Sequence, residues 1–81
     1  MDDQVVNPVV GLRKTLGLSR AQLARATGIA YTELGRAEAG YCPTLPTRVL
    51  AALVAAGVPE PEAAYQRWRE AQRVTLAVPT E

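Results

Sequence analysis

Apolar residues recur every three or four positions along most of the chain, which is the spacing of helices with one buried face. Glycine or proline separates these stretches from one another. The pattern predicts five helices, over about residues 8–16, 19–27, 30–39, 46–56 and 61–73. The residues expected to face the core are Val9, Leu12, Leu16, Leu23, Ala24, Leu34, Ala37, Val49, Leu50, Leu53, Ala56, Ala64, Tyr65, Trp68 and Ala71. In the last helix, Arg67 and Arg69 are expected on the solvated side.

The first two predicted helices have clear start signals. Asn7 precedes Pro8, and this pair is typical of an N-cap followed by the first helical residue. Ser19 lies three residues before Gln22, which predicts a capping box in which each side chain accepts the other residue's backbone N–H. Gly28 predicts the end of the second helix, because glycine readily adopts a positive φ.

Three segments fall outside the helical pattern. Two prolines within residues 41–46 exclude a continuous helix and predict a loop. Residues 1–7 are expected to form an N-terminal arm before a domain over residues 8–73. Residues 74–81 form a C-terminal tail with β-branched alternation, so a short strand, a docked extension and a disordered tail all remain open. A strand there would need a partner strand from another subunit.

The composition fits one small all-α domain. The chain has 81 residues, of which 48% are hydrophobic and 5% aromatic, so helices packed through small and aliphatic side chains must form its core. Histidine is absent and Cys42 is the single cysteine, which excludes a disulfide framework, a zinc finger and histidine-dependent catalysis. Paired catalytic carboxylates and a glycine-rich phosphate loop are also missing. We therefore expect neither an enzyme nor a bound cofactor or metal.

Charge is unevenly distributed, although the net charge is only +1. Six basic and two acidic residues lie between Arg13 and Arg48, whereas acidic residues outnumber basic ones on either side. A basic segment between acidic flanks indicates either a polyanionic partner or ordinary solvated helix faces. The charge pattern alone leaves both interpretations open.

The second and third predicted helices contain the residues that a helix-turn-helix unit needs. Ala24 is small enough to let two helices approach closely, and Gly28 allows a sharp turn. Leu34 and Ala37 then supply the inward-facing pair of the third helix. Two helices that cross at roughly 90–120° through a short glycine-containing turn need this arrangement.

Several short motifs follow one another along about residues 9–58. They are Leu16-Gly17-Leu18-Ser19-Arg20, Leu23-Ala24, Gly28-Ile29, Leu34-x-Arg36-x-Glu38-x-Gly40 and Gly57-Val58. This order resembles the Xre family, the Cro and lysogeny-repressor class of helix-turn-helix proteins. The resemblance implies a five-helix, lambda-repressor-like fold that binds double-stranded DNA with its third helix in the major groove. It also implies a homodimer on a palindromic operator, whose half-sites lie about one helical turn apart.

The resemblance assigns roles to individual residues. Those expected to face DNA bases are Tyr31, Thr32, Glu33 and Arg36. Those expected to contact phosphate are Arg13, Lys14, Arg20, Tyr41 and Thr44. Arg36 can donate to guanine, Thr32 can touch a thymine methyl group and Glu33 can accept from cytosine. The N-terminus of the second helix adds backbone N–H donors for a phosphate.

The third helix departs from the family pattern. Ala30 stands where the family usually has a serine or threonine cap, and the loss of such a cap costs about 0.5–2 kcal/mol. Arg36 is the only basic residue of this helix, which also contains Glu33 and Glu38. We expect Glu38 to form an internal ion pair or a cap rather than a contact with DNA.

The near-neutral net charge leaves a second function open on the same fold. The domain can serve as a protein-interaction module, such as an antitoxin or a phage protein that binds a host factor, through the fifth helix or the tail. No apolar run reaches the roughly 20 residues that span a bilayer, and the N-terminus lacks a secretory signal. The leading interpretation is a cytoplasmic transcriptional regulator of phage or bacterial Cro/repressor type that binds specific DNA sequences.

Overall fold

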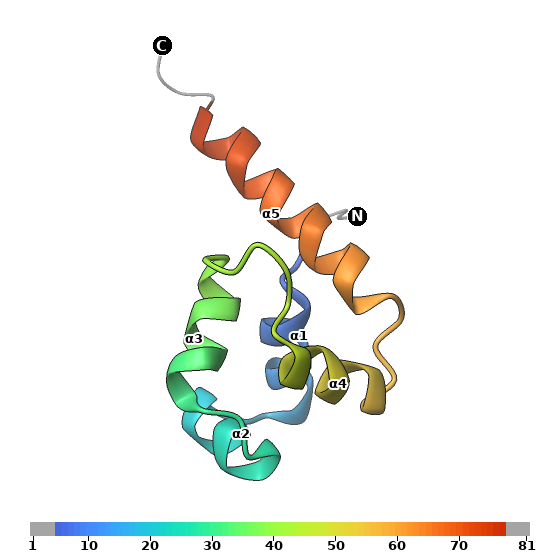
Figure 1. The fold of residues 1–81 in the computed structure, drawn as a ribbon. Helices are drawn as coiled ribbons and strands as arrows, with labels where there is room; N and C mark the ends of the chain where they lie inside the picture. Colours follow the sequence, from blue (N-terminus) through green and yellow to red (C-terminus); the bar gives the residue numbers. More distant parts are fainter. Residues whose placement is uncertain (1–4, 78–81) are drawn as a thin grey trace.

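The helices that the sequence predicts are present, and most of their ends lie close to the predicted ones. The computed structural model describes residues 5–77, with the side chains of residues 5–72. These residues form five helices and no strand (Figure 1). The helices are α1 (Pro8–Leu16), α2 (Arg20–Thr27), α3 (Tyr31–Ala39), α4 (Thr47–Ala55) and α5 (Pro61–Ala77).

Local capping interactions set the ends of the first helices. The side-chain oxygen of Asn7 accepts hydrogen bonds from the second and third backbone N–H groups of α1, at 2.8 and 3.3 Å. Ser19 and Gln22 form the predicted capping box, and Gly28 ends α2 with a φ of 76°. These predictions are confirmed, because each depends on residues within one helical turn. Ala30, the N-cap of α3, makes no side-chain cap hydrogen bond, as its methyl side chain requires.

Helix α5 is longer than the sequence analysis predicted. It continues to Ala77, so residues 74–77 are helical and the strand, one of the three alternatives left open for the tail, is excluded there. No glycine or proline follows Pro61 within this helix, and β-branched residues favour a strand only where another strand pairs with them. The remaining parts of the predicted arm and tail, residues 1–4 and 78–81, lie outside the described residues.

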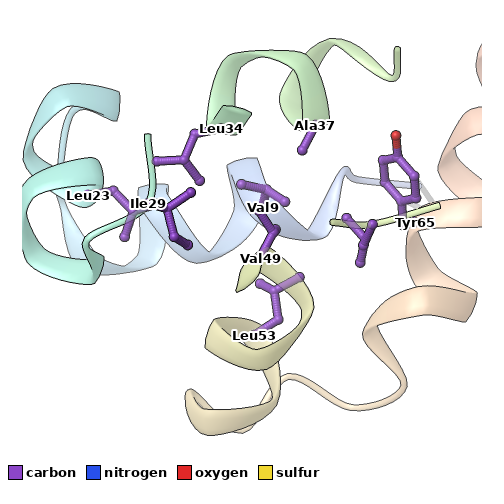
Figure 2. Packing of buried hydrophobic residues seen from close by; sticks show 9 residues of the cluster. Val9, Leu23, Ile29, Leu34, Ala37, Val49, Leu53 and Tyr65 are labelled. Carbon is purple, nitrogen blue, oxygen red and sulfur yellow. The ribbon is translucent and has the colours of Figure 1, made fainter. Parts of the chain in front are cut away.

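The core lies where α1, α3, α4 and α5 meet. Val9, Leu34, Val49 and Leu53 come together from the first three of these helices, and Tyr65 adds its buried ring from α5 (Figure 2). The other buried hydrophobic residues are Leu23, Ile29, Ala37 and Leu45. Burial of one large aliphatic or aromatic side chain stabilises a fold by about 1.5–3 kcal/mol, so this cluster supplies the main driving force for folding.

Two residues that the pattern placed in the core lie at the surface. Leu16 is 53% exposed at the end of α1, and Ala56 is exposed as the C-cap of α4. Both lie where their helix leaves the core. The spacing of apolar residues gives the face of a helix but not where that face stops being buried, so it placed both residues in the core. Gly57 follows the C-cap Ala56 with a φ of 85°.

Asn7 belongs to the folded domain rather than to an N-terminal arm. Its side chain is buried, and Nδ2 donates hydrogen bonds to the backbone oxygens of Ala37 and Glu38 at 3.1 and 3.2 Å. The same side chain therefore caps α1 and ties α1 to the end of α3. The predicted arm over residues 1–7 is wrong at its last residue, because a local cap gives no sign of this distant contact.

The arrangement of the helices leaves one side of α3 uncovered. Helix α1 contacts α3, α4 and α5, whereas α2 packs on α3. In Figure 1, α2 and α3 lie on the left of the molecule, and α4 lies to their right. The C-terminal part of α5 extends beyond the other helices (Figure 1).

The hydroxyl group of Tyr65 makes folding sensitive to high pH. It donates a 2.6 Å hydrogen bond to the backbone oxygen of Cys42. Desolvation raises the pKa of Tyr65 above its ordinary value, so the folded state favours the protonated phenol.

We expect Tyr65→Phe to lower the free energy of unfolding by about 1 kcal/mol near neutral pH, the usual net value of one hydrogen bond. The contribution of the hydroxyl is complete below about pH 10, the unfolded pKa of tyrosine, and is lost as the pH rises through the higher folded pKa. Urea unfolding from neutral to alkaline pH should show the two proteins converging in stability. A difference that stays constant with pH would contradict this role.

Candidate nucleic-acid interface

Helix α3 has one buried and one exposed side. Leu34 and Ala37 face the core, as predicted. Tyr31, Thr32 and Arg36 are exposed, and Tyr31 keeps 52% of its surface accessible. The structure therefore leaves these three predicted base-contacting residues accessible on one helix, and an exposed helix of this size can enter a DNA major groove.

The loop after α3 extends the same surface. Thr32, Glu33 and Arg36 line one shallow hollow together with Tyr41. Glu33 is half-buried, whereas Tyr41 is 76% exposed. The other lining residues are Ala30, Cys42, Pro43 and Pro46. Residues assigned to bases and to phosphate thus meet around one depression, although they come from a helix and a loop.

Three exposed candidates, Tyr31, Lys14 and Thr44, do not line this hollow. Lys14 is in the last turn of α1, and Thr44 is in the loop before α4. Both side chains are exposed, but neither lines the depression. Only the path of a bound duplex would bring them into the same interface.

Side chains of α5 fix the loop that carries Tyr41. Gln66 Nε2 and Arg69 Nη1 both donate hydrogen bonds to the backbone oxygen of Pro43, at 2.7 and 3.1 Å. Glu62 Oε1 accepts the backbone N–H of Leu45 at 3.1 Å. The hydroxyl of Tyr65 likewise donates to the backbone oxygen of Cys42. These bonds satisfy backbone groups that a loop otherwise leaves to water.

The sequence analysis missed this role of α5. Arg69 was expected on the solvated side, but it is half-buried, and its Nε donates to the backbone oxygen of Gly40 at 3.3 Å. Its guanidinium carbon also lies 5.9 Å from the centroid of the Tyr65 ring. Glu62, Gln66 and Arg69 are four and three residues apart, which places them on one helix face. A polar stripe beside the apolar stripe was the signal that could have revealed them.

Gly40 ends α3 directly under an aromatic ring. A Cβ atom on Gly40 would lie 2.7 Å from Cζ3 of Trp68, and the backbone φ is 83°. Both the close approach and the positive φ favour glycine. The ring of Trp68 stacks near that of Tyr65, with centroids 6.1 Å apart. The end of α3 is therefore positioned by the aromatic residues of α5.

A buried carboxylate joins the first three helices. Glu38 is 8% exposed, and its two oxygens accept Nε and Nη2 of Arg13 at 2.9 and 3.2 Å. Its Oε1 also accepts Nη2 and Nε of Arg20 at 3.0 and 3.2 Å. The prediction of an internal ion pair for Glu38 is confirmed. The pairing of this carboxylate with two arginines was not predicted.

The two arginines differ in their exposure. The side chain of Arg13 is 21% exposed, and its Nη1 donates to the backbone oxygen of Leu18 at 3.4 Å. The side chain of Arg20 is 36% exposed, and its guanidinium carbon lies 5.5 Å from the centroid of the Tyr31 ring. The hydrogen bond to Glu38 raises the pKa of Arg20, so Arg20 stays charged throughout the physiological range.

A helix-turn-helix family model matches residues 12–58, which is more than half of the chain. The chain belongs to the Xre/Cro-type helix-turn-helix family. Members of this family are DNA-binding domains with a lambda-repressor-like fold and no enzymatic activity. The match runs from within α1 to the residue after Gly57, so it includes all of α2, α3 and α4.

The other comparisons give no further relative. No curated protein and no solved structure matches the chain significantly. Within the part of the helix-turn-helix protein that the structure describes, no helix is long and apolar enough to cross a membrane. The same part contains no group of three or more histidine, cysteine or acidic residues placed to hold a metal ion.

We expect Glu38→Gln to lower the free energy of unfolding by about 2 kcal/mol, which is less than the loss of a fully buried ion pair because both guanidinium groups keep some contact with water. The matched control is Glu33→Gln, which removes a carboxylate from the first turn of the same helix and should cost below about 1 kcal/mol. Chemical denaturation of the three proteins gives both values. Equal effects of the two changes would contradict a structural role for Glu38.

We expect Gly40→Ala to destabilise the helix-turn-helix protein more than Gly28→Ala does. Both glycines have positive φ, but a Cβ atom meets the ring of Trp68 at Gly40 and nothing within 4 Å at Gly28. The change at Gly28 should cost about 1 kcal/mol, and the change at Gly40 about 2–4 kcal/mol. Thermal unfolding followed by Trp68 fluorescence checks both, and a cost at Gly40 no larger than that at Gly28 would refute the packing argument.

Proposed function

We propose that this helix-turn-helix protein is a sequence-specific transcriptional regulator of phage or bacterial Cro/repressor type. It acts on double-stranded DNA in the cytoplasm of a bacterium or a phage-infected cell, and it needs no cofactor. The observation that supports this proposal best is the polar side of α3, which stays exposed while the opposite side is locked into the core.

In this proposal α3 enters the major groove and reads base edges. Arg36 donates two hydrogen bonds to guanine, a contact that contributes about 1–3 kcal/mol of discrimination. Thr32 touches a thymine methyl group, and Glu33 accepts from the amino group of cytosine. Tyr31 presents its ring and hydroxyl at the start of the helix. The hollow that Thr32, Glu33 and Arg36 line with the following loop supports a shared contact surface.

Phosphate contacts flank the base-reading helix. Arg20 and the free N–H groups at the start of α2 lie at a helix N-terminus, which favours an anion. Lys14, Tyr41 and Thr44 are exposed and supply further contacts with the DNA backbone.

Arg13 has a different part in the proposal from the one first expected. Its three side-chain nitrogens each donate within the protein, to Glu38 and to the backbone oxygen of Leu18. We therefore assign Arg13 to holding Glu38, and not to a direct phosphate contact.

The regulator binds its operator as a homodimer in this proposal, because one chain of this size makes few contacts and two half-sites double them. Exposed and partly buried apolar residues support an association surface away from α3. An apolar groove runs between α1, the α4–α5 loop and α5, and it includes Val6, Leu12 and Val58. A homodimer would select palindromic sequences with half-sites about one helical turn apart.

We expect fluorescence anisotropy with short duplexes drawn from a genomic fragment library to detect binding that weakens with salt, by a slope of about −0.9 for each phosphate neutralised. Arg36→Ala should reduce discrimination between the preferred duplex and its guanine-substituted variants by about tenfold. The control is Arg25→Ala, which removes an exposed arginine from the last turn of α2 and should leave discrimination unchanged. Absence of binding at low salt would rule the proposed function out.

A further inference from the structure

Arg20 links two distant points of α3. It is the first residue of α2, and it donates two hydrogen bonds to Glu38 near the end of α3. Its guanidinium carbon also lies 5.5 Å from the ring centroid of Tyr31, the first residue of α3. Seven residues separate these two partners along the helix, a distance of about 10 Å. One guanidinium group thus contacts the side chains of residues at the beginning and near the end of α3.

Gly35 leaves the space in which this arginine lies. A Cβ atom on Gly35 would be 3.3 Å from Nη1 and 3.8 Å from Cζ of Arg20. The guanidinium group therefore rests against the backbone of α3 between Tyr31 and Glu38. Glycine weakens the interior of a helix, and no positive φ at Gly35 explains its presence. In this structure, the absence of a side chain at Gly35 leaves room for the guanidinium group of Arg20.

We propose that Arg20 is a specificity-determining positioning residue, which holds the ring of Tyr31 in the orientation in which Tyr31 meets one base position. This inference rests on the proposed function, since it concerns how the base-reading side chain of Tyr31 is oriented before DNA binds. It differs from the simpler role of Arg20 as a positive charge for a phosphate.

The contacts explain why the ring needs support. Tyr31 is about half exposed at the start of a helix whose N-cap has no side-chain hydrogen bond. An unsupported ring there would lose side-chain freedom on binding DNA, and that ordering weakens binding. A cation fixed over the ring face restricts the ring beforehand. Glu38 fixes the cation, because a planar guanidinium bound to a carboxylate has little freedom to turn.

Two variants separate positioning from charge. Arg20→Lys keeps the positive charge but loses the planar group that binds Glu38 and covers the ring. Gly35→Ala keeps every contacting group and places a methyl group against Nη1 of Arg20. Tyr31→Leu identifies the base position that Tyr31 reads. Arg25→Lys, at an exposed arginine in the last turn of α2, is the matched control for the charge-conserving change.

The experiment is selection from a pool of random duplexes of about 20 base pairs, followed by anisotropy with the selected duplex and its single-base variants. We expect Arg20→Lys and Gly35→Ala each to lose about fivefold or more of the preference at the position affected by Tyr31→Leu, and little at other positions. In the double variant R20K/G35A, the second change should add little. The ring signals of Tyr31 in the NMR spectrum of the free protein should shift in both single variants and not in Arg25→Lys.

Each alternative result has a distinct meaning. An unchanged base preference in both variants overturns the inference. An equal loss of affinity for all duplexes in both variants, with the base preferences retained, makes Arg20 a phosphate contact only and also overturns the inference. If Arg20→Lys unfolds, Gly35→Ala alone decides the question. Failure of the wild-type protein to enrich any sequence removes the proposed function, and the inference falls with it.

Discussion

The carboxylate of Glu38 is the interaction on which the arrangement of the first three helices depends. It is almost fully buried, and it accepts hydrogen bonds from one arginine of α1 and one of α2. A buried carboxylate is unfavourable unless charged donors satisfy it. The most favourable arrangement therefore fixes both helices against the inner side of α3. Asn7 adds a neutral tie at the same place, because it donates to the backbone oxygen of Glu38.

Helix α5 provides the second constraint, at the C-terminal end of α3 and the loop that follows it. Its aromatic and polar side chains hold the end of α3 and the following loop through backbone oxygens and through the close packing of Trp68 on Gly40. The C-terminal end of α3 and the following loop are thereby held by side chains of α5 that do not belong to the proposed reading surface. Such support reduces the freedom that the loop and α3 would lose on binding, which favours recognition by a preformed surface.

The distribution of charge makes DNA binding compatible with a small net charge. The chain as a whole has a charge of +1, so long-range attraction to a polyanion is weak. Two arginines share one carboxylate beside the N-terminus of α2, which leaves a local positive charge next to a helix end that also favours anions. Specific contacts of α3, more than bulk charge, must then supply the affinity of the proposed complex.

The sequence by itself determined the helices, the capping box at Ser19 and the turn at Gly28, because these features depend on residues within one or two helical turns. Its motifs also sufficed to indicate the helix-turn-helix family and an internal role for Glu38. The tertiary structure alone decided that Arg13 and Arg20 meet this carboxylate, that Arg69 binds the loop and that Arg20 lies across Gly35 to Tyr31. These contacts join residues 11 to 29 positions apart. No local period encodes such pairs, and only the packing of the helices brings them into contact.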